Sequence, residues 1–413
     1  MGRAKNYFGQ KTAYALGAAI LGSCCTVPAF GQSAGQKDIN EINLTLDVTH
    51  DSNVARSDLV NAALRGVKQS DERLAAGIQV LFGRELGRNT ISLDGFVGYD
   101  FYRRNTQLNR ERIGIGAALG LRAGPCEVNL TPRIDSHQSD LSSIYFVNLP
   151  GIDSVKNTET VQTYGGDVRC GRVFGLRPLL GYTRTIGDNS NAARQISNYR
   201  SSRYSGGFAY DNPVAGKYSL TLERENIFYP DRAGGPLAAV SGYRTDQLKL
   251  HGERKIGTIL TARGSFGYSH VKPKSATVQS FKGISWSLSG TIVPLPRLQL
   301  TFGTERAISP SLGVEALYSR NKSYDLSAVY ALTSRTSLSA GVNYEQRQYR
   351  GASALFGPLL DNDKVMRARI GADYKASRRF KIGLEGGYER RNANGTIYDF
   401  DSTFVAVRTR FTL

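Results

Sequence analysis

Apolar and polar residues alternate along most of this chain, and the alternation is clearest near its end. In the segment 366–374, Met366, Ala368 and Ile370 alternate with Arg367 and Arg369. Because successive side chains of a β-strand point to opposite faces, one face of this segment is apolar and the other is charged. The same pattern follows at 380–388 and at 405–413. Strands of this kind are typical of a barrel with lipid outside and water in its lumen.

The alternation recurs through the whole chain, with short turns and longer polar loops in strict succession. Breaker clusters such as Ala123-Gly124-Pro125 mark the short turns, and no helical period of about 3.6 residues lies between them. The sequence therefore predicts an all-β fold, a transmembrane, antiparallel, up-and-down β-barrel of about 18 strands within a range of roughly 16–18, each near ten residues long. The expected strands are 42–48, 74–82, 91–101, 113–121, 128–134, 164–170, 176–182, 204–210, 218–222, 248–250, 260–268, 284–292, 298–302, 324–332, 338–344, 366–374, 380–388 and 405–413.

A membrane barrel explains this meander better than a soluble β-sandwich does. A sandwich needs two sheets whose apolar faces meet, whereas lipid requires a sheet without unpaired edges. An even strand number places both chain ends on the periplasmic side, with short turns there and long loops outside. The longest expected loop, 135–157, contains the apolar run Ile144-Tyr-Phe-Val147. We expect this loop to constrict or cover the pore, or to contact another protein.

The first 31 residues are predicted to be a signal peptide. Three bases precede an apolar run at 13–21, and the small-x-small sequence at 29–31 is a cleavage site. We expect cleavage after Gly31, which leaves residues 32–413 as a single outer-membrane β-barrel domain. The sequence Leu-Gly-Ser-Cys at 21–24 resembles a bacterial lipobox, so processing before Cys24 is the alternative.

The chain carries a formal charge of +18, of which three bases lie in the leader, leaving +15. A strongly basic protein raises nucleic acid as a partner. The bases here stand singly between apolar residues rather than in clusters, so we expect no nucleic-acid role.

Two cysteines remain after processing, Cys126 and Cys170. Both fall beside short turns of neighbouring expected strands, on the same face. The oxidising envelope favours a disulfide between them, and two free thiols are the alternative.

The face opposite the apolar one carries the candidate functional residues. Acids are mixed with the bases on this face, so paired charges that line a wet wall are one interpretation; an anion path is the other, because the bases are densest on the last three strands. The predicted pore-lining bases are Arg367, Arg369, Lys381, Arg408, Arg410, Arg263 and Lys249.

Signals of enzymatic chemistry are weak. None of the four histidines has metal-ligand spacing, and no nucleophile elbow or phosphate loop occurs. His251 lies between Lys249 and Glu253 and is interpreted as a polar lumen residue rather than a general base. We expect no enzyme activity, no metal and no cofactor.

The first strand and its exit, Leu46-Asp-Val-Thr-His-Asp-Ser-Asn-Val-Ala-Arg56, together with the barrel pattern, resemble the outer-membrane β-barrel porins of Gram-negative bacteria found with exopolysaccharide systems. The resemblance implies a bacterial outer-membrane channel for an anionic polysaccharide or similar polar solute, with polysaccharide export components as partners. The alternatives are a non-transporting scaffold barrel and a general solute porin. Outer-membrane lipid and the barrel assembly machinery, which would recognise the C-terminal strand, are further expected partners. The pattern leaves the oligomeric state open.

Overall fold

The protein is an 18-stranded antiparallel β-barrel, as the sequence predicts. The computed structural model describes residues 38–139, 141, 155–276, 278–311, 316–351, 360–395 and 398–413, and the expected signal peptide lies outside them. Each strand pairs with the next along the chain, and β18 pairs with β1 to close the sheet. The strands are β1 (Ile39–Asp51), β2 (Asp71–Leu86), β3 (Asn89–Tyr102), β4 (Arg110–Ala123), β5 (Cys126–Gln138), β6 (Thr158–Cys170), β7 (Gly175–Asn189), β8 (Tyr199–Asn212), β9 (Gly216–Phe228), β10 (Gly242–Ile256), β11 (Leu260–Pro273), β12 (Phe281–Leu295), β13 (Leu298–Pro310), β14 (Tyr318–Ala331), β15 (Thr336–Arg350), β16 (Asn362–Lys375), β17 (Phe380–Ala393) and β18 (Phe400–Thr412).

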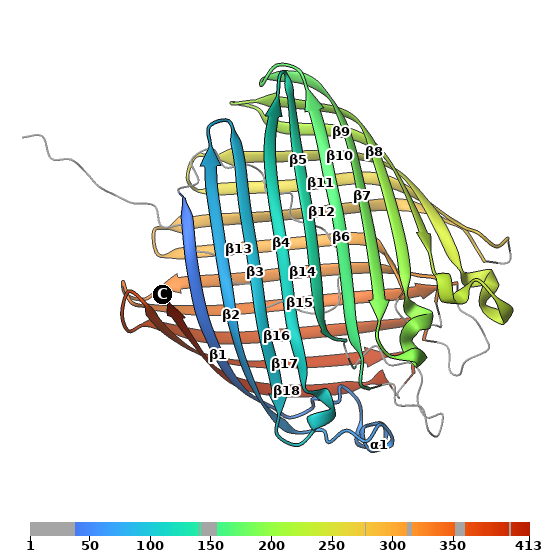
Figure 1. Ribbon diagram of the computed structural model, residues 1–413, viewed down its shortest axis with the longest axis vertical. Helices are drawn as coiled ribbons and strands as arrows, with labels where there is room; N and C mark the ends of the chain where they lie inside the picture. Colours follow the sequence, from blue (N-terminus) through green and yellow to red (C-terminus); the bar gives the residue numbers. More distant parts are fainter. Residues whose placement is uncertain are drawn as a thin grey trace, which may run out of the picture.

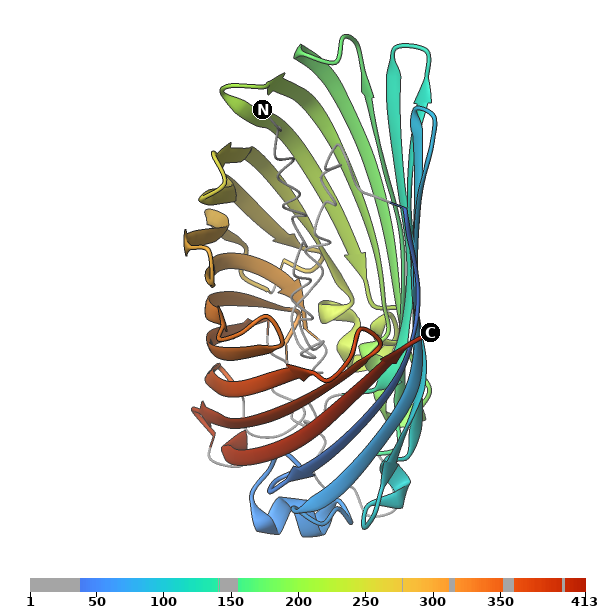
Figure 2. The same ribbon diagram turned by 90° about the vertical axis from the view of Figure 1, so that its left-hand side faces the viewer.

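The two ends of the barrel differ. Figure 1 shows tight hairpin turns at one end and the helical segments at the other, and Figure 2 shows the C-terminus beside β1. The predicted breaker cluster is a two-residue turn between β4 and β5, where Gly124 has a φ of +59° that favours glycine. We call these two ends the turn end and the loop end.

The strands are longer than predicted, at 13–16 residues instead of about ten. The prediction followed the apolar face, which spans only the hydrocarbon core of a membrane, about 30 Å thick. Beyond that length the strands continue with polar residues on both faces. On β15, for example, Gln346 and Gln348 extend the outer face past Tyr344.

Side chains alternate between an outward and an inward face, as the pattern predicts. On β1, Ile42 and Leu44 are 43% and 42% exposed, whereas Asn43 between them is 1% exposed. Neighbours inside a curved wall crowd inward residues, while outward residues stand free to meet lipid. We use outward and inward in this sense below.

The helices of the described residues are short and lie in the connections at the loop end. They are α1 (Leu59–Leu64), η1 (Thr106–Leu108), η3 (Ala192–Ser197), η4 (Pro230–Arg232) and η5 (Gly235–Val240). No helix in the described ranges is long and apolar enough to cross a membrane.

One loop packs against the inner wall at the loop end. The β9–β10 connection supplies Tyr229, Leu237 and Val240 to a buried cluster, and Tyr229 Oη donates a 2.8 Å hydrogen bond to the Leu317 carbonyl. The same cluster contains inward residues of the strands, namely Tyr199, Ile227, Tyr243 and Val271. The β9–β10 loop therefore occupies part of the mouth.

The predicted constricting loop, 135–157, begins later than expected because β5 continues to Gln138. Residues 142–154, including the apolar run, lie outside the described part of the chain. The two described ends of this loop, Leu141 and Val155, pack in a cluster with Ala62 of α1.

Cys126 and Cys170 are directly opposite in the β5–β6 register, and the structure joins them by a disulfide. Both lie at the turn end. The bridge therefore ties the β5–β6 hairpin together at its open side, 44 residues apart in sequence.

Candidate functional site

All seven predicted bases occupy inward positions, but they do not form one group. Arg367 and Arg369 lie on β16, Lys381 on β17, and Arg408 and Arg410 on β18, so five of them share three adjacent strands. Lys249 on β10 and Arg263 on β11 lie in another part of the wall.

Three of the five bases on β16–β18 are held by acids. Arg367 Nε lies 2.9 Å from Glu389 Oε1, and Arg408 contacts both oxygens of Glu385, at 2.8 and 3.1 Å. Lys381 Nζ lies 3.2 Å from Asp373. For these three bases, the structure agrees with the interpretation that paired charges line the wall.

The two distant bases are paired as well. Lys249 Nζ lies 2.8 Å from Glu223, and Arg263 Nε lies 3.3 Å from Glu253. His251 Nε2 is 3.6 Å from Glu223 Oε1, which places it in the same polar group.

Arg369 and Arg410 differ from the others. Among the described residues, neither has an acid within ion-pair distance. The residues directly opposite Arg369 are Gly341 and Gly387, which have no side chains, and those opposite Arg410 are Lys381 and Thr45. Neither guanidinium group therefore has an acid directly opposite it on a neighbouring strand, and both face the lumen.

The inward face of β16–β18 is basic as a whole. Its inward positions carry seven bases and four acids. The acids are Asp363, Asp373, Glu385 and Glu389. Three positive charges therefore remain after one-to-one pairing.

Because the barrel closes, charged residues of β1, β2 and β4 lie near the inward charges of β16–β18, although they are remote in sequence. Across the junction of β18 with β1, Asp47 lies opposite Arg408. The charges of three further arginines, Arg73, Arg112 and Arg410, also act on Asp47. We call Asp47 and these four arginines the seam cluster.

Asp100 and Phe96 of β3 hold part of the seam cluster in place. Arg112 Nε lies 2.9 Å from Asp100, and Arg73 lies 3.6 Å from it. The Arg112 guanidinium stacks over the Phe96 ring at 5.0 Å from its centroid. The sequence did not predict Arg73 as part of this group, because β2 is remote from β18 along the chain. Closure of an even-stranded barrel is the signal that places the two strands close together.

Two further arginines lie at the loop end. Arg65, which caps α1, donates to the carbonyls of Ala55 and Leu141 at 3.4 and 3.3 Å. Arg194 of η3 donates to Ser139 Oγ at 2.5 Å. Burial, reinforced by the charge of Arg194, lowers the pKa of Arg65 to about 10, so it stays charged at neutral pH.

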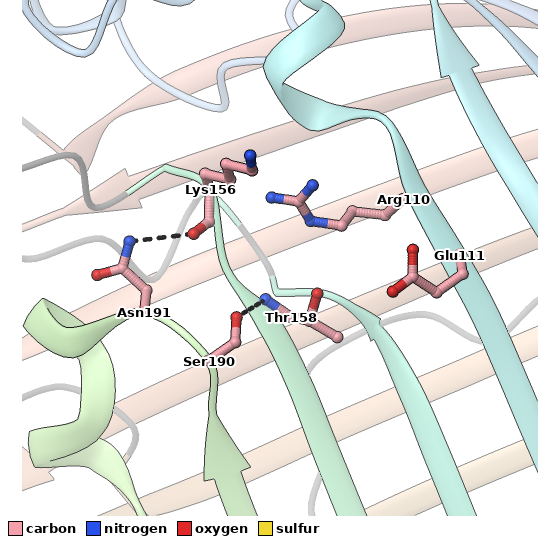
Figure 3. Close-up of a pocket in the computed structure, with 6 residues that line it drawn as sticks. All are labelled: Arg110, Glu111, Lys156, Thr158, Ser190 and Asn191. Atoms are coloured by element: carbon pink, nitrogen blue, oxygen red, sulfur yellow. Dashed lines mark hydrogen bonds between the residues drawn. The ribbon is translucent and has the colours of Figure 1, made fainter.

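A polar recess of about 370 Å³ lies at the rim between the β3–β4, β5–β6 and β7–β8 connections. Figure 3 shows Arg110, Glu111 and Lys156 around it, with Asn191 donating to the Lys156 carbonyl at 3.0 Å. Two bases and one carboxylate line it, so it is a mixed-charge recess at the rim. The described residues contain no group of three or more His, Cys, Asp or Glu side chains that would hold a metal ion.

A closed barrel with an apolar outer surface and a charged inner wall defines the class, a β-barrel of the outer-membrane type. Residues 246–413, from β10 to the end of β18, match the family model described as "Putative beta-barrel porin 2". No curated protein matches the chain.

Several solved porin structures are similar to the chain at low identity. Pseudomonas aeruginosa OccK2 (OpdF), crystallised with glucuronate, is 14% identical with a TM-score of 0.46, covering 92% of this chain and 100% of that one. Acinetobacter baumannii OccAB3 is 12% identical with a TM-score of 0.44, covering 91% and 99%. A BenF-like porin from Pseudomonas fluorescens is 13% identical with a TM-score of 0.46, covering 91% and 99%.

Proposed function

We propose that the protein passes anionic, hydroxyl-rich solutes across the outer membrane, with an acidic polysaccharide or its sugar-acid units as the cargo. The observation that supports this most is the unmatched pair Arg369 and Arg410, on a wall with seven bases against four acids. A guanidinium in a water-filled pore attracts a carboxylate over several ångströms, and it offers paired donors that match carboxylate geometry.

A second part of the lumen fits the hydroxyl groups of such a solute. The inward positions of β12 from 283 to 291 are one glycine, three serines and one threonine. Ser285 Oγ lies 2.9 Å from Ser269 Oγ, and Ser287 Oγ lies 3.4 Å from Ser265 Oγ. A hydroxyl both donates and accepts, so this wall exchanges hydrogen bonds with a sugar in any orientation.

The channel proposal is tested in planar bilayers and proteoliposomes with the purified full-length barrel. We expect an anion-preferring reversal potential in a potassium chloride gradient, and faster entry of glucuronate than of uncharged glucose. Equal entry of the two sugars would favour a general solute porin. A silent barrel would favour the scaffold alternative and remove the channel proposal.

The polysaccharide part of the proposal needs a separate measurement. An acidic oligosaccharide series of increasing length should block the ionic current from both sides and, above a threshold voltage, pass through. If only the monosaccharide enters and longer chains never block, the cargo is a small sugar acid and polysaccharide export components are not partners.

A further inference from the structure

The outward residues of the barrel change from apolar to basic within one cross-strand row near the loop end. On β9–β12, one cross-strand row of outward residues is fully apolar or aromatic: Leu222, Leu248, Tyr268 and Ile284. These side chains are between 44% and 68% exposed. The aromatic ring marks the level at which hydrocarbon gives way to lipid headgroups.

The next outward positions toward the loop end are mostly basic. Arg224, Asp246, His270 and Lys282 form one cross-strand row, and Arg244 and Lys272 pair in the row beyond it. We call these six residues the outer basic patch. It lies immediately above the apolar band, where the headgroups of the outer leaflet begin.

One carboxylate, that of Asp246, is within ion-pair distance of three bases in this patch. Asp246 lies 2.7 Å from Arg224 Nε, 3.2 Å from Arg244 Nε and 3.7 Å from Lys272 Nζ. The three basic side chains remain 57%, 40% and 43% exposed. Lys282, directly opposite His270, is also exposed. The patch therefore holds four permanent positive charges and one acid, on a surface that faces lipid headgroups.

The excess of bases continues around this side of the barrel but not at its other end. The outward positions of β11–β17, all of them described, contain no Asp or Glu. They carry further bases beyond the aromatic level, including Arg306, Lys322, Lys364 and Arg390. At the turn end of β9–β12 the outward positions hold one base, Arg254. A need for solubility does not explain why outward bases are more numerous at the loop end than at the turn end, because both ends of the barrel emerge into water.

We propose that the outer basic patch binds the phosphate groups of an anionic lipid in the outer leaflet. Phosphate esters supply several charged acceptor oxygens, and basic side chains at a membrane surface attract anionic lipids. The loop end faces the outer leaflet because both ends of an even-stranded barrel chain are periplasmic. A phosphorylated glycolipid whose acyl chains lie on Leu222, Leu248 and Tyr268 places its phosphates at the level of the patch.

The test uses the purified full-length barrel in detergent micelles, with native mass spectrometry as the binding measurement. The probes are bisphosphorylated lipid A, the same lipid with its phosphates removed, and inorganic phosphate as a competitor. We expect wild-type protein to retain the bisphosphorylated form only, and R224Q/K272Q to bind it about tenfold or more weakly. The matched double variant R84Q/R254Q removes two outward bases at the turn end and should bind like wild type.

Asp246→Asn gives a second test that depends on the sign of the effect. Removing the shared carboxylate frees three bases, so lipid A should bind more tightly although the ion-pair network is lost. Unchanged or weaker binding by this variant, with an unchanged unfolding temperature, would overturn the proposal. The proposal would also be overturned if wild-type protein retained the dephosphorylated lipid as well as the bisphosphorylated form. Displacement of lipid A by inorganic phosphate at equal concentration would assign the patch to free phosphate instead.

Discussion

Replacement of Arg369 and Arg410 by Gln should reduce the anion preference of the channel without unfolding it. Both guanidinium groups lack acid partners among the described residues, so their removal leaves no inward carboxylate newly unpaired. On the inward face of β16–β18 the variant R369Q/R410Q has five bases against four acids. The wall that was clearly basic becomes almost neutral.

The size of the effect follows from the Coulomb relation. An anion about 5 Å from one guanidinium gains roughly 0.8 kcal/mol in water-like surroundings and about 3 kcal/mol at an effective dielectric constant of about 20. Two charges at the lower figure give about 1.6 kcal/mol, which is roughly a fifteenfold change in anion occupancy. Screening by salt, with a Debye length of about 10 Å at 0.1 M, reduces this to a severalfold fall in the anion-to-cation permeability ratio.

The assay is the reversal potential of single channels under a salt gradient, repeated at low and high ionic strength. The matched control is K364Q/R390Q, which removes two bases from the outward face of β16 and β17. That control should leave the permeability ratio unchanged. If both variants shift it equally, the effect is one of net charge. If R369Q/R410Q leaves it unchanged, the wall is only structural.

Two predictions concern stability. Asp363→Asn should lower the free energy of unfolding by about 3–5 kcal/mol in a urea titration from lipid vesicles. The fully buried Asp363 lies 2.7 Å from the largely buried Arg347 and 2.6 Å from the buried Arg391, and both would lose their counter-charge. A loss no larger than that caused by Asp373→Asn, at a half-exposed acid, would contradict this prediction. The double variant C126S/C170S should lose about 2–4 kcal/mol, and wild-type protein should lose the same amount on reduction, whereas a reductant effect that persists in the variant would mean that the bridge is not its cause.

The number of strands and the face of each side chain followed from the sequence. Alternation is a local property with a period of two, so Ile42 and Asn43 could be assigned to opposite faces without knowledge of any neighbour. The disulfide was one of two alternatives, because sequence gave the rim and the face of Cys126 and Cys170 but not their separation.

Which acid pairs with which base could not be predicted from the sequence. The pairing depends on the register between neighbouring strands and on the closure of β18 against β1. Arg367 meets Glu389 because the two are directly opposite on β16 and β17, which a shift of one residue would undo. Arg408 was predicted as a pore-lining base, and the structure pairs it with Glu385. Arg73 joins Arg408 only through β1, which lies between β2 and β18. Strand lengths were underestimated for a different reason, because the apolar face ends before the strands do.

The junction of β1 with β18 links assembly to selectivity. Ser402 donates to Asp51 across 351 residues of sequence, and Asp47 meets Arg408 at the same junction. These contacts form only when the last strand reaches the first, so an unclosed intermediate has strands and turns but no complete charge wall. Ion preference would then appear at the moment of closure, and a recording of it during insertion would time the final step of biogenesis.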